Sequence, residues 1–97
     1  MDVAQQMLEY LRDYHTKESS AVKNRDLRLL FNLNDRQVRL LVSQLRQEGE
    51  PICSSSYGYW YGTAPEDIVK TMHRLEAQVH NMNISIRGLR KVLKGNR

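Results

Sequence analysis

The sequence predicts a mainly α-helical protein with one small β-hairpin, and three observations carry this prediction. Apolar residues recur at helical spacing in three segments before Gly49. The stretch SSSYGYWYG, residues 54–62, follows these segments and has the glycine and aromatic residues that are typical of a hairpin. From Ile68 to Leu93, apolar residues then recur without a break at alternating gaps of four and three positions.

The length and composition are those of a single globular domain. A chain of 97 residues can bury a modest core without disulfides, and the single Cys53 fits a reducing cytoplasm. The N-terminus lacks the basic region and the apolar run of a signal peptide. No segment reaches the ~18 apolar residues of a membrane helix. We therefore expect a cytoplasmic protein that does not bind a membrane.

The first helix is expected over residues 2–15. Its apolar residues share one face at the spacing of an amphipathic helix: Val3, Met7, Tyr10, Leu11 and Tyr14. A polar break follows over residues 16–20. We expect the next two residues, Ala21 and Val22, to form a short buried segment.

The second helix is expected in the segment NRDLRLLFN. Asn24 is its candidate cap, because an asparagine side chain can accept a hydrogen bond from a free backbone N–H of the first turn. Leu27, Leu30 and Phe31 are expected to face the core. Residues 32–34 are too few and too polar to form more than a turn.

The third helix is expected to begin after Asn34. Gln37 lies three residues further on, which is the spacing of a capping box. Gly49 and Pro51 are its stop signals. Its predicted apolar face consists of Val38, Leu41, Val42 and Leu45.

The hairpin is expected to pair residues 51–54 with residues 59–62. Side chains alternate between the faces of a strand, so Tyr59 and Tyr61 share one face and Trp60 takes the other. We expect the two tyrosines to point inward or half inward, and Trp60 to be exposed or packed on the last helix. An open aromatic platform for single-stranded nucleic acid is the alternative.

The last helix is expected to start at Thr63, its candidate cap, with Pro65 and Glu66 in the first turn, and to run to about Lys94. Its apolar residues form a heptad stripe with Ile68 at the start. We expect the rest of the stripe to form a homodimer interface: Met72, Leu75, Val79, Met82, Ile86, Leu89 and Leu93.

The heptad leaves the geometry of the dimer open. The β-branched Val79 and Ile86 at a positions lean mildly towards two parallel strands. Few opposite charges flank the stripe, so antiparallel pairing and a four-helix bundle stay open. Within a single chain, the first turns, from Ile68 to Leu75, could instead pack on the first helix.

This order of elements, with a three-residue turn between the second and third helices, is the layout of a winged helix-turn-helix over residues 1–62, followed by a long helix over residues 63–97. The runs DRQVR (35–39), LRQEGEPICS (45–54) and GY (58–59) also resemble winged-helix proteins encoded by phages and integrated elements of Gram-positive bacteria. The resemblance covers roughly residues 3–62. It implies a small DNA-binding regulator or a replication-associated protein in a bacterial cytoplasm.

Charge placement favours a polyanionic partner. Residues 23–46 hold six basic and two acidic residues, and residues 87–97 hold five basic residues and no acid. In a winged helix, the outer face of the third helix enters the major groove, and Leu40 departs from the polar residues usual there. The candidate contacts on this face are Arg36, Gln37, Arg39, Leu40, Ser43 and Gln44.

Further contacts are expected outside the third helix. The cations Lys23, Arg25 and Arg28 are placed for phosphates, and the hairpin turn offers Ser55, Ser56 and Tyr57. A solvated face is the alternative for the third helix. Arg46 is expected to pair with Glu48 or Glu50. The basic residues after Ile86 fit the negative end of the helix dipole, or they could contact phosphates or an acidic protein.

No catalytic residue, cofactor or metal site is expected, because the sequence offers no phosphate loop and no cluster of metal ligands. Cys53 is expected to be a small buried hydrophobic residue. The resulting hypothesis is a sequence-specific double-stranded DNA-binding protein, a dimeric transcriptional or replication regulator of a phage or mobile element. The alternative is a protein-interaction module on the same scaffold, with Leu40 and the aromatic residues as its contact patch.

Overall fold

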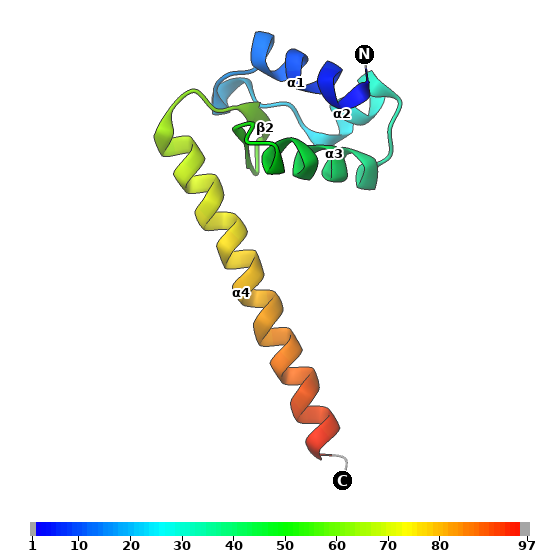
Figure 1. The fold of residues 1–97 in the computed structure, drawn as a ribbon, viewed down its shortest axis with the longest axis vertical. Helices are drawn as coiled ribbons and strands as arrows, with labels where there is room; N and C mark the ends of the chain where they lie inside the picture. The colour runs from blue at the N-terminus through cyan, green and yellow to red at the C-terminus, as the bar shows by residue number, and fades with distance from the viewer. Residues whose placement is uncertain (1, 96–97) are drawn as a thin grey trace.

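The structure, a computed structural model, describes residues 2–95. Its elements in chain order are α1 (Val3–Tyr14), the 3₁₀ helix η1 (Glu18–Ser20), α2 (Asn24–Phe31), α3 (Asp35–Gln47), β1 (Ile52–Ser55), β2 (Gly58–Tyr61) and α4 (Pro65–Gly95) (Figure 1). The chain is mainly helical, with a two-stranded antiparallel hairpin and a long last helix. This confirms the prediction at the level of secondary structure.

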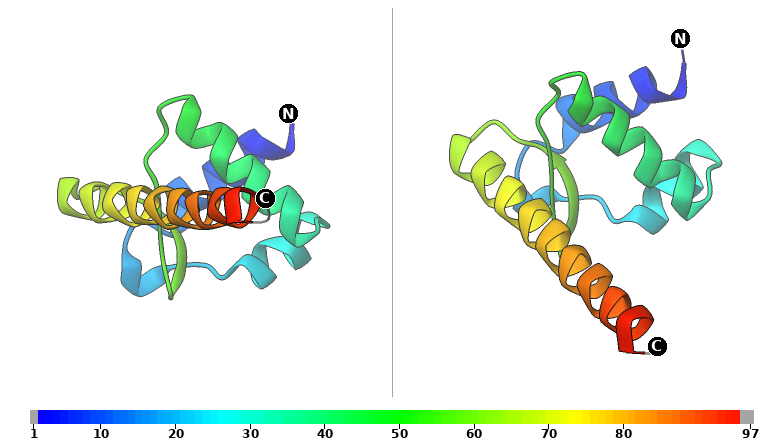
Figure 2. Two further views of the ribbon diagram at one scale, coloured as in Figure 1. Left: turned by 90° about the horizontal axis from the view of Figure 1, so that it is seen from below. Right: turned by 60° about the horizontal axis from the view of Figure 1, so that its bottom comes forward.

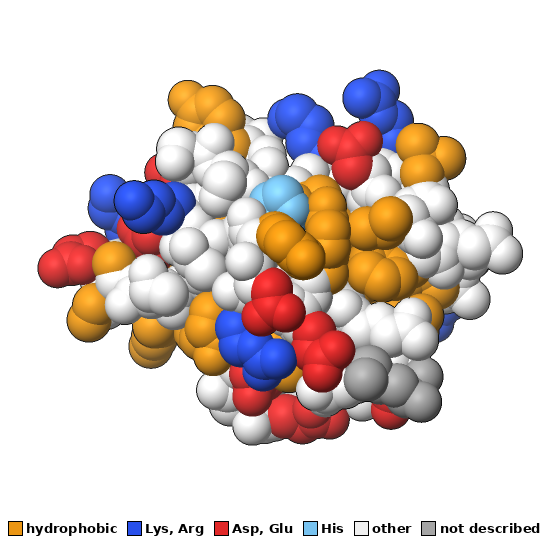
Figure 3. All heavy atoms as spheres, turned by 90° about the horizontal axis from the view of Figure 1, so that it is seen from above, with side chains coloured by type: hydrophobic (Ala, Val, Ile, Leu, Met, Phe, Trp, Pro, Cys, Tyr) orange, Lys and Arg blue, Asp and Glu red, His pale blue; other side chains and the backbone are white. Residues whose placement is uncertain are grey.

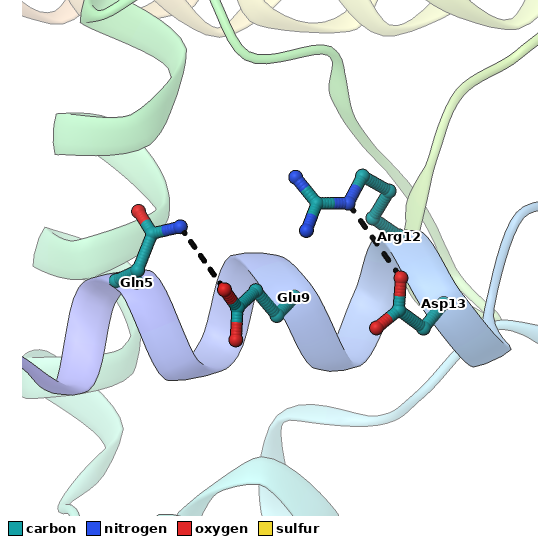
Figure 4. A network of polar contacts seen from close by, with 4 residues as sticks. All are labelled: Gln5, Glu9, Arg12 and Asp13. Atoms are coloured by element: carbon teal, nitrogen blue, oxygen red, sulfur yellow. Dashed lines mark hydrogen bonds and ion pairs between the residues drawn. The ribbon is translucent and has the colours of Figure 1, made fainter. Parts of the chain in front are cut away.

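The helix α1 buries one face and exposes a mixed polar face. Its buried residues, Ala4, Met7, Leu8 and Leu11, lie in the core. The Asp2 side chain caps the helix by accepting from the N–H of Gln5 at 2.8 Å. Figure 4 shows polar contacts between exposed α1 side chains, Gln5 to Glu9 and Arg12 to Asp13. Tyr14 is exposed, and its ring lies 5.9 Å from that of Tyr10, with which it shares the predicted face.

The segment between α1 and α2 is more ordered than a polar break. The Ser20 hydroxyl donates to the carbonyl of Lys17 at 3.0 Å and closes η1. The next buried residue, Val22, exchanges two backbone hydrogen bonds of 2.8 Å with Tyr59. Val22 therefore pairs with β2 as a third strand of one residue would. It is buried, as predicted.

The helix α2 begins at Asn24, the residue that was predicted to precede and cap it. Lys23 precedes the helix without a side-chain cap, and Asn24 is the first helical residue, so the predicted Asn24 cap is wrong. Leu27 is buried and Phe31 is partly buried. Leu30 is exposed, contrary to prediction, because a helix of eight residues presents only a narrow i, i+4 stripe to the core.

The capping box of α3 is confirmed. The Asn34 side chain accepts from the N–H of Gln37 at 2.8 Å, and the Gln37 side chain accepts from the N–H of Asn34 at 2.9 Å. Leu41 is partly buried, and Gly49 after the helix has φ +91°, which favours glycine. The fully buried residues of the predicted face are Val38, Val42 and Leu45.

The hairpin lies between α4 and the other helices. Cys53 pairs with Trp60, and Ile52 pairs with Tyr61, across a turn formed by residues 56 and 57. Trp60 is only 3% exposed, and its indole N–H donates to the Asp67 carboxylate of α4 at 3.2 Å. The tyrosines of β2 are half-buried against the core. The predicted faces are therefore correct, with Trp60 packed on the last helix.

The helix α4 is one continuous helix of 31 residues, as predicted. Ala64, and not Thr63, precedes it, because the Ala64 carbonyl accepts from the N–H of Asp67 and Ile68. Its first turns pack mainly on β1 and not on α1. Its distal part projects away from the body of residues 2–62 and gives the molecule an extent of 57 × 31 × 23 Å (Figures 1 and 2).

Candidate nucleic-acid interface

A polar cleft lies where the start of α2, the hairpin turn and the third turn of α4 meet. Its volume is about 460 Å³, and three cations but no carboxylates line it. We call this site the basic cleft. Its lining residues are Lys23, Asn24, Arg25, Ser54, Ser55, Ser56, Gly58, Tyr59, Arg74 and Gln78.

Two of the cations are held by the hairpin backbone. The Lys23 ammonium donates to the carbonyl of Ser56 at 3.4 Å, and the Arg74 guanidinium donates to the carbonyl of Ser54 at 2.7 Å. Arg25 is more open, with a contact of 3.9 Å to the Asp26 carboxylate. The cleft therefore concentrates positive charge beside backbone and hydroxyl groups. Cations, hydroxyls and backbone N–H groups are the groups with which proteins contact phosphates.

The structure brings together four residues that the sequence predicts for phosphate contact: Lys23, Arg25, Ser55 and Ser56. Arg28, also predicted, does not line the cleft. It is half-buried, and its Nε atom has no hydrogen-bond partner among the described residues. Tyr57 is exposed at the tip of the hairpin turn, where its N–H donates to the Ser55 hydroxyl at 3.1 Å.

The predicted outer face of α3 is exposed along its length. Most of its polar side chains have partners within the helix. Arg39 forms an ion pair with Asp35 at 2.8 Å, and Gln37 belongs to the capping box. Ser43 accepts from Gln47 at 3.1 Å, and Gln44 donates to Glu48 at 3.2 Å.

Two residues on this face are free to meet a ligand without breaking a contact. The Arg36 side chain has no hydrogen bond or ion pair within residues 2–95. The neighbouring Leu40 is 55% exposed. The pairs made by Arg39, Ser43 and Gln44 are all exposed, and such pairs are worth little, so they are easily exchanged for a ligand.

Arg46 is a structural residue, and its predicted pairing with Glu48 or Glu50 is wrong. Its guanidinium donates to the carbonyl of Ile52 at 2.8 Å and to the hydroxyl of Ser54 at 3.0 Å. Burial lowers its pKa from the ordinary arginine value. The helix α3 is thereby fastened to β1, a contact that local spacing does not reveal.

Cys53 is buried, as the sequence predicts. Burial raises the pKa of its thiol, and this disfavours the reactive thiolate. Within residues 2–95, no group of three or more histidine, cysteine and acidic side chains is arranged to hold a metal ion. No helix in the same range has the length and hydropathy needed to cross a bilayer.

Among the lining residues that were not predicted as contacts are Arg74 and Gln78 of α4. Both lie off the apolar stripe, and the only available signal was a cation on the polar side of the last helix. The face of α4 that meets the hairpin depends on tertiary packing. The positions of these residues beside Ser54 and Ser55 therefore emerge only in the fold.

The face of the body that carries α1 differs from the basic cleft. Figure 3 shows hydrophobic side chains gathered near its centre, with cations at the upper and left edges and a further cation among acidic side chains below the centre. Tyr10 of α1 is partly buried against the core, and its ring centroid is 4.7 Å from that of His15 and 5.9 Å from that of Phe31. Comparison with models of protein families, with curated proteins and with solved structures found no match.

Proposed function

We propose that this chain is a sequence-specific double-stranded DNA-binding protein with a winged helix-turn-helix. The support for the fold is the order α1, the Val22 bridge, α2, α3 and the hairpin, together with the three-residue turn before α3. The biological role that fits the sequence resemblance is transcriptional or replication control in a phage or mobile element, within a bacterial cytoplasm.

The observation that carries the proposal is the basic cleft beside the hairpin turn. Lys23 just before α2, Arg25 of α2 and Arg74 of α4 converge there, with no carboxylate among the lining residues. A phosphate in the cleft would replace water at these cations. Each phosphate neutralised releases counterions and steepens the salt dependence of binding by about 0.9 in log–log slope.

The free residues of α3 supply base recognition in this proposal. The Arg36 guanidinium presents two parallel donors to O6 and N7 of a guanine in the major groove, and Leu40 contacts a thymine methyl group. Gln37, Arg39, Ser43 and Gln44 are contacts that form when their weak pairs open. Homodimerisation through α4 doubles the contacts and matches a two-fold symmetric site.

Fluorescence anisotropy of a labelled duplex at about 50 and about 200 mM salt tests the proposal. A labelled duplex is needed because Trp60 is buried and reports poorly on DNA. We expect Arg25→Ala to lower the log–log salt slope by about 0.9. We expect Arg36→Ala to weaken binding of the preferred site by about tenfold or more.

Arg12→Ala is the matched control. It also removes one cation, but Arg12 lies on α1, pairs with Asp13 and does not line the basic cleft. Equal losses from Arg12→Ala and Arg25→Ala would mean that only the net charge matters. Absence of duplex binding by the folded wild-type chain at low salt would contradict the proposal.

A protein-interaction module is the second candidate, and the exposed leucines favour it. Leu29, Leu30 and Leu40 are all more than half exposed. Under this function, Leu40→Ser weakens capture of a protein partner, and Arg36→Ala leaves that capture unchanged. A single-stranded DNA platform is not supported, because Trp60 is buried, the β2 tyrosines are half-buried and Tyr57 is the only exposed aromatic residue of the described hairpin.

A further inference from the structure

The distal part of α4 carries an apolar stripe that no other part of the described chain covers. Every residue from Glu76 to Gly95 is exposed. The exposed stripe residues, Met72, Val79, Met82, Ile86, Leu89 and Leu93, have between 45% and 74% of their surface in solvent. In proteins, most of the stability of a helix comes from packing of its apolar face, so burial of the stripe would stabilise this part of α4.

The charges along α4 are unevenly placed. The turns before Val79 hold three acidic residues, Glu66, Asp67 and Glu76, and two basic ones. The turns after Ile86 hold four basic residues and no acid within the described helix: Arg87, Arg90, Lys91 and Lys94. Two parallel copies would set these basic ends side by side, which is unfavourable. Two antiparallel copies would set each basic end beside the acidic half of its partner.

An apolar hollow of about 320 Å³ lies at the body end of the stripe. It opens between α4, β1 and the loop before β1. Three stripe residues, Ile68, Met72 and Leu75, form one wall, and Gly49, Pro51, Ile52 and Cys53 form the other. Arg46, Glu50 and Thr71 also line the hollow. The hollow therefore continues the stripe into the body. In a parallel dimer, the hollow of the second copy would lie at the same level along α4. In an antiparallel dimer, the C-terminal end of the second copy's α4 would lie at this level instead.

We propose that a second copy of this chain packs antiparallel on α4, with the end of its helix in the apolar hollow. Core layers of an antiparallel pair join an a position to a d position, and one register pairs all eight stripe residues. In this register, the layers join Ile68 to Leu93, Met72 to Leu89, Leu75 to Ile86 and Val79 to Met82 of the second copy. The two-fold axis passes between His80 and Asn81, and Leu89 and Leu93 of the second copy fill the hollow.

A charged pair flanks the stripe in the same register. Glu76 and Arg90 each follow a d position, so they lie on the same flank. Helical side chains lean towards the N-terminus of their own helix, and in antiparallel helices this brings Glu76 towards Arg90 of the second copy. Parallel helices would instead place Glu76 near Gln78 or Thr71, which carry no charge.

Disulfide trapping tests the orientation. In a Cys53→Ala background, Met72→Cys and Leu89→Cys are oxidised separately and as an equimolar, refolded mixture. A disulfide needs Cα atoms closer than about 7 Å. The proposed register brings position 72 to position 89 of the second copy, and it separates like positions by about 25 Å along the helix. We expect cross-linked dimer in the mixture and none in either single variant.

Cross-linking of either single variant alone would indicate parallel helices and overturn the proposal. Absence of any cross-link, with sedimentation at the 11.4 kDa monomer mass, would overturn it as well. Circular dichroism of each variant checks that it folds. The proposal rests on the dimer in the proposed function, but the test uses no DNA, so failure of DNA binding and failure of the antiparallel pair are separate results.

A charge exchange gives an independent readout without cysteine. Glu76→Arg and Arg90→Glu each place like charges together and should weaken dimerisation about three- to tenfold, counting both copies of the pair. The double variant should restore most of the affinity. Equal weakening by the two single variants without recovery in the double variant would contradict the pairing.

Discussion

The body of residues 2–62 and the distal part of α4 contain the same kind of apolar pattern in opposite surroundings. In α1 and α3, residues at helical spacing are buried, with Met7, Leu11 and Val38 fully covered. In α4, apolar residues at equally regular spacing stand in solvent from Val79 onward. The difference lies in what surrounds each helix, because both patterns form continuous helices.

An amphipathic pattern forms an apolar face, but it does not determine what covers that face. Spacing determines that a helix has an apolar face, and the rest of the fold determines what covers that face. Full burial of one such side chain is worth about 1.5–3 kcal/mol. In the body, this free energy stabilises the monomer. In α4, it remains available to a second chain.

The largest effect is expected from a charge placed in the apolar stripe of α4. Ile86→Asp would bury an unpaired carboxylate in each half of the dimer, which costs several kcal/mol. We expect dimer affinity to fall by at least about a thousandfold, measured by sedimentation, while the body keeps its unfolding midpoint.

Ile84→Asp is the matched control for this substitution. Ile84 is also isoleucine and is 51% exposed, against 45% for Ile86, but it lies off the stripe. We expect it to leave the dimer intact. Dissociation by both variants would show that helix propensity, and not the stripe, controls association.

The second prediction concerns the body. Leu27 is fully buried, and Leu27→Ala should lower the free energy of unfolding by about 2–5 kcal/mol, because it removes packed atoms and leaves a cavity. Leu29→Ala, two residues away and 77% exposed, should change it by less than about 0.5 kcal/mol. Urea unfolding measures both. Similar effects of the two variants would mean that α2 does not pack as the structure shows.

Much of the fold could be predicted because its signals are local. The capping box of Asn34 and Gln37 and the glycine stop at Gly49 depend on residues a few positions apart. The heptad of α4 likewise depends on a short repeat along one helix. Leu30 was assigned wrongly to the core because periodicity in a short helix does not show how far the neighbouring elements extend.

The candidate interface was harder to predict, because the packing of elements that are distant in the sequence determines which residues meet there. Lys23, Arg25 and the hairpin serines were identified as polar residues near a helix start and a turn. That they converge on one cleft with Arg74 depends on the packing of α4 against β1. The partner of Arg46 is also tertiary, since a backbone carbonyl of β1 carries no signal in the sequence.

The smallest predicted effect compares two asparagines at helix starts. Asn34 accepts the hydrogen bond of the Gln37 N–H, and Asn34→Ala should lower the free energy of unfolding by about 1 kcal/mol. Asn24 lies one residue inside α2, and its buried Oδ1 atom has no hydrogen-bond partner within the described chain. Asn24→Ala removes that unsatisfied acceptor, so we expect no loss of stability or a small gain. Urea unfolding of the two variants side by side checks this. An equal loss in both would mean that Asn24 is satisfied in solution, by water or by a ligand in the basic cleft that it lines.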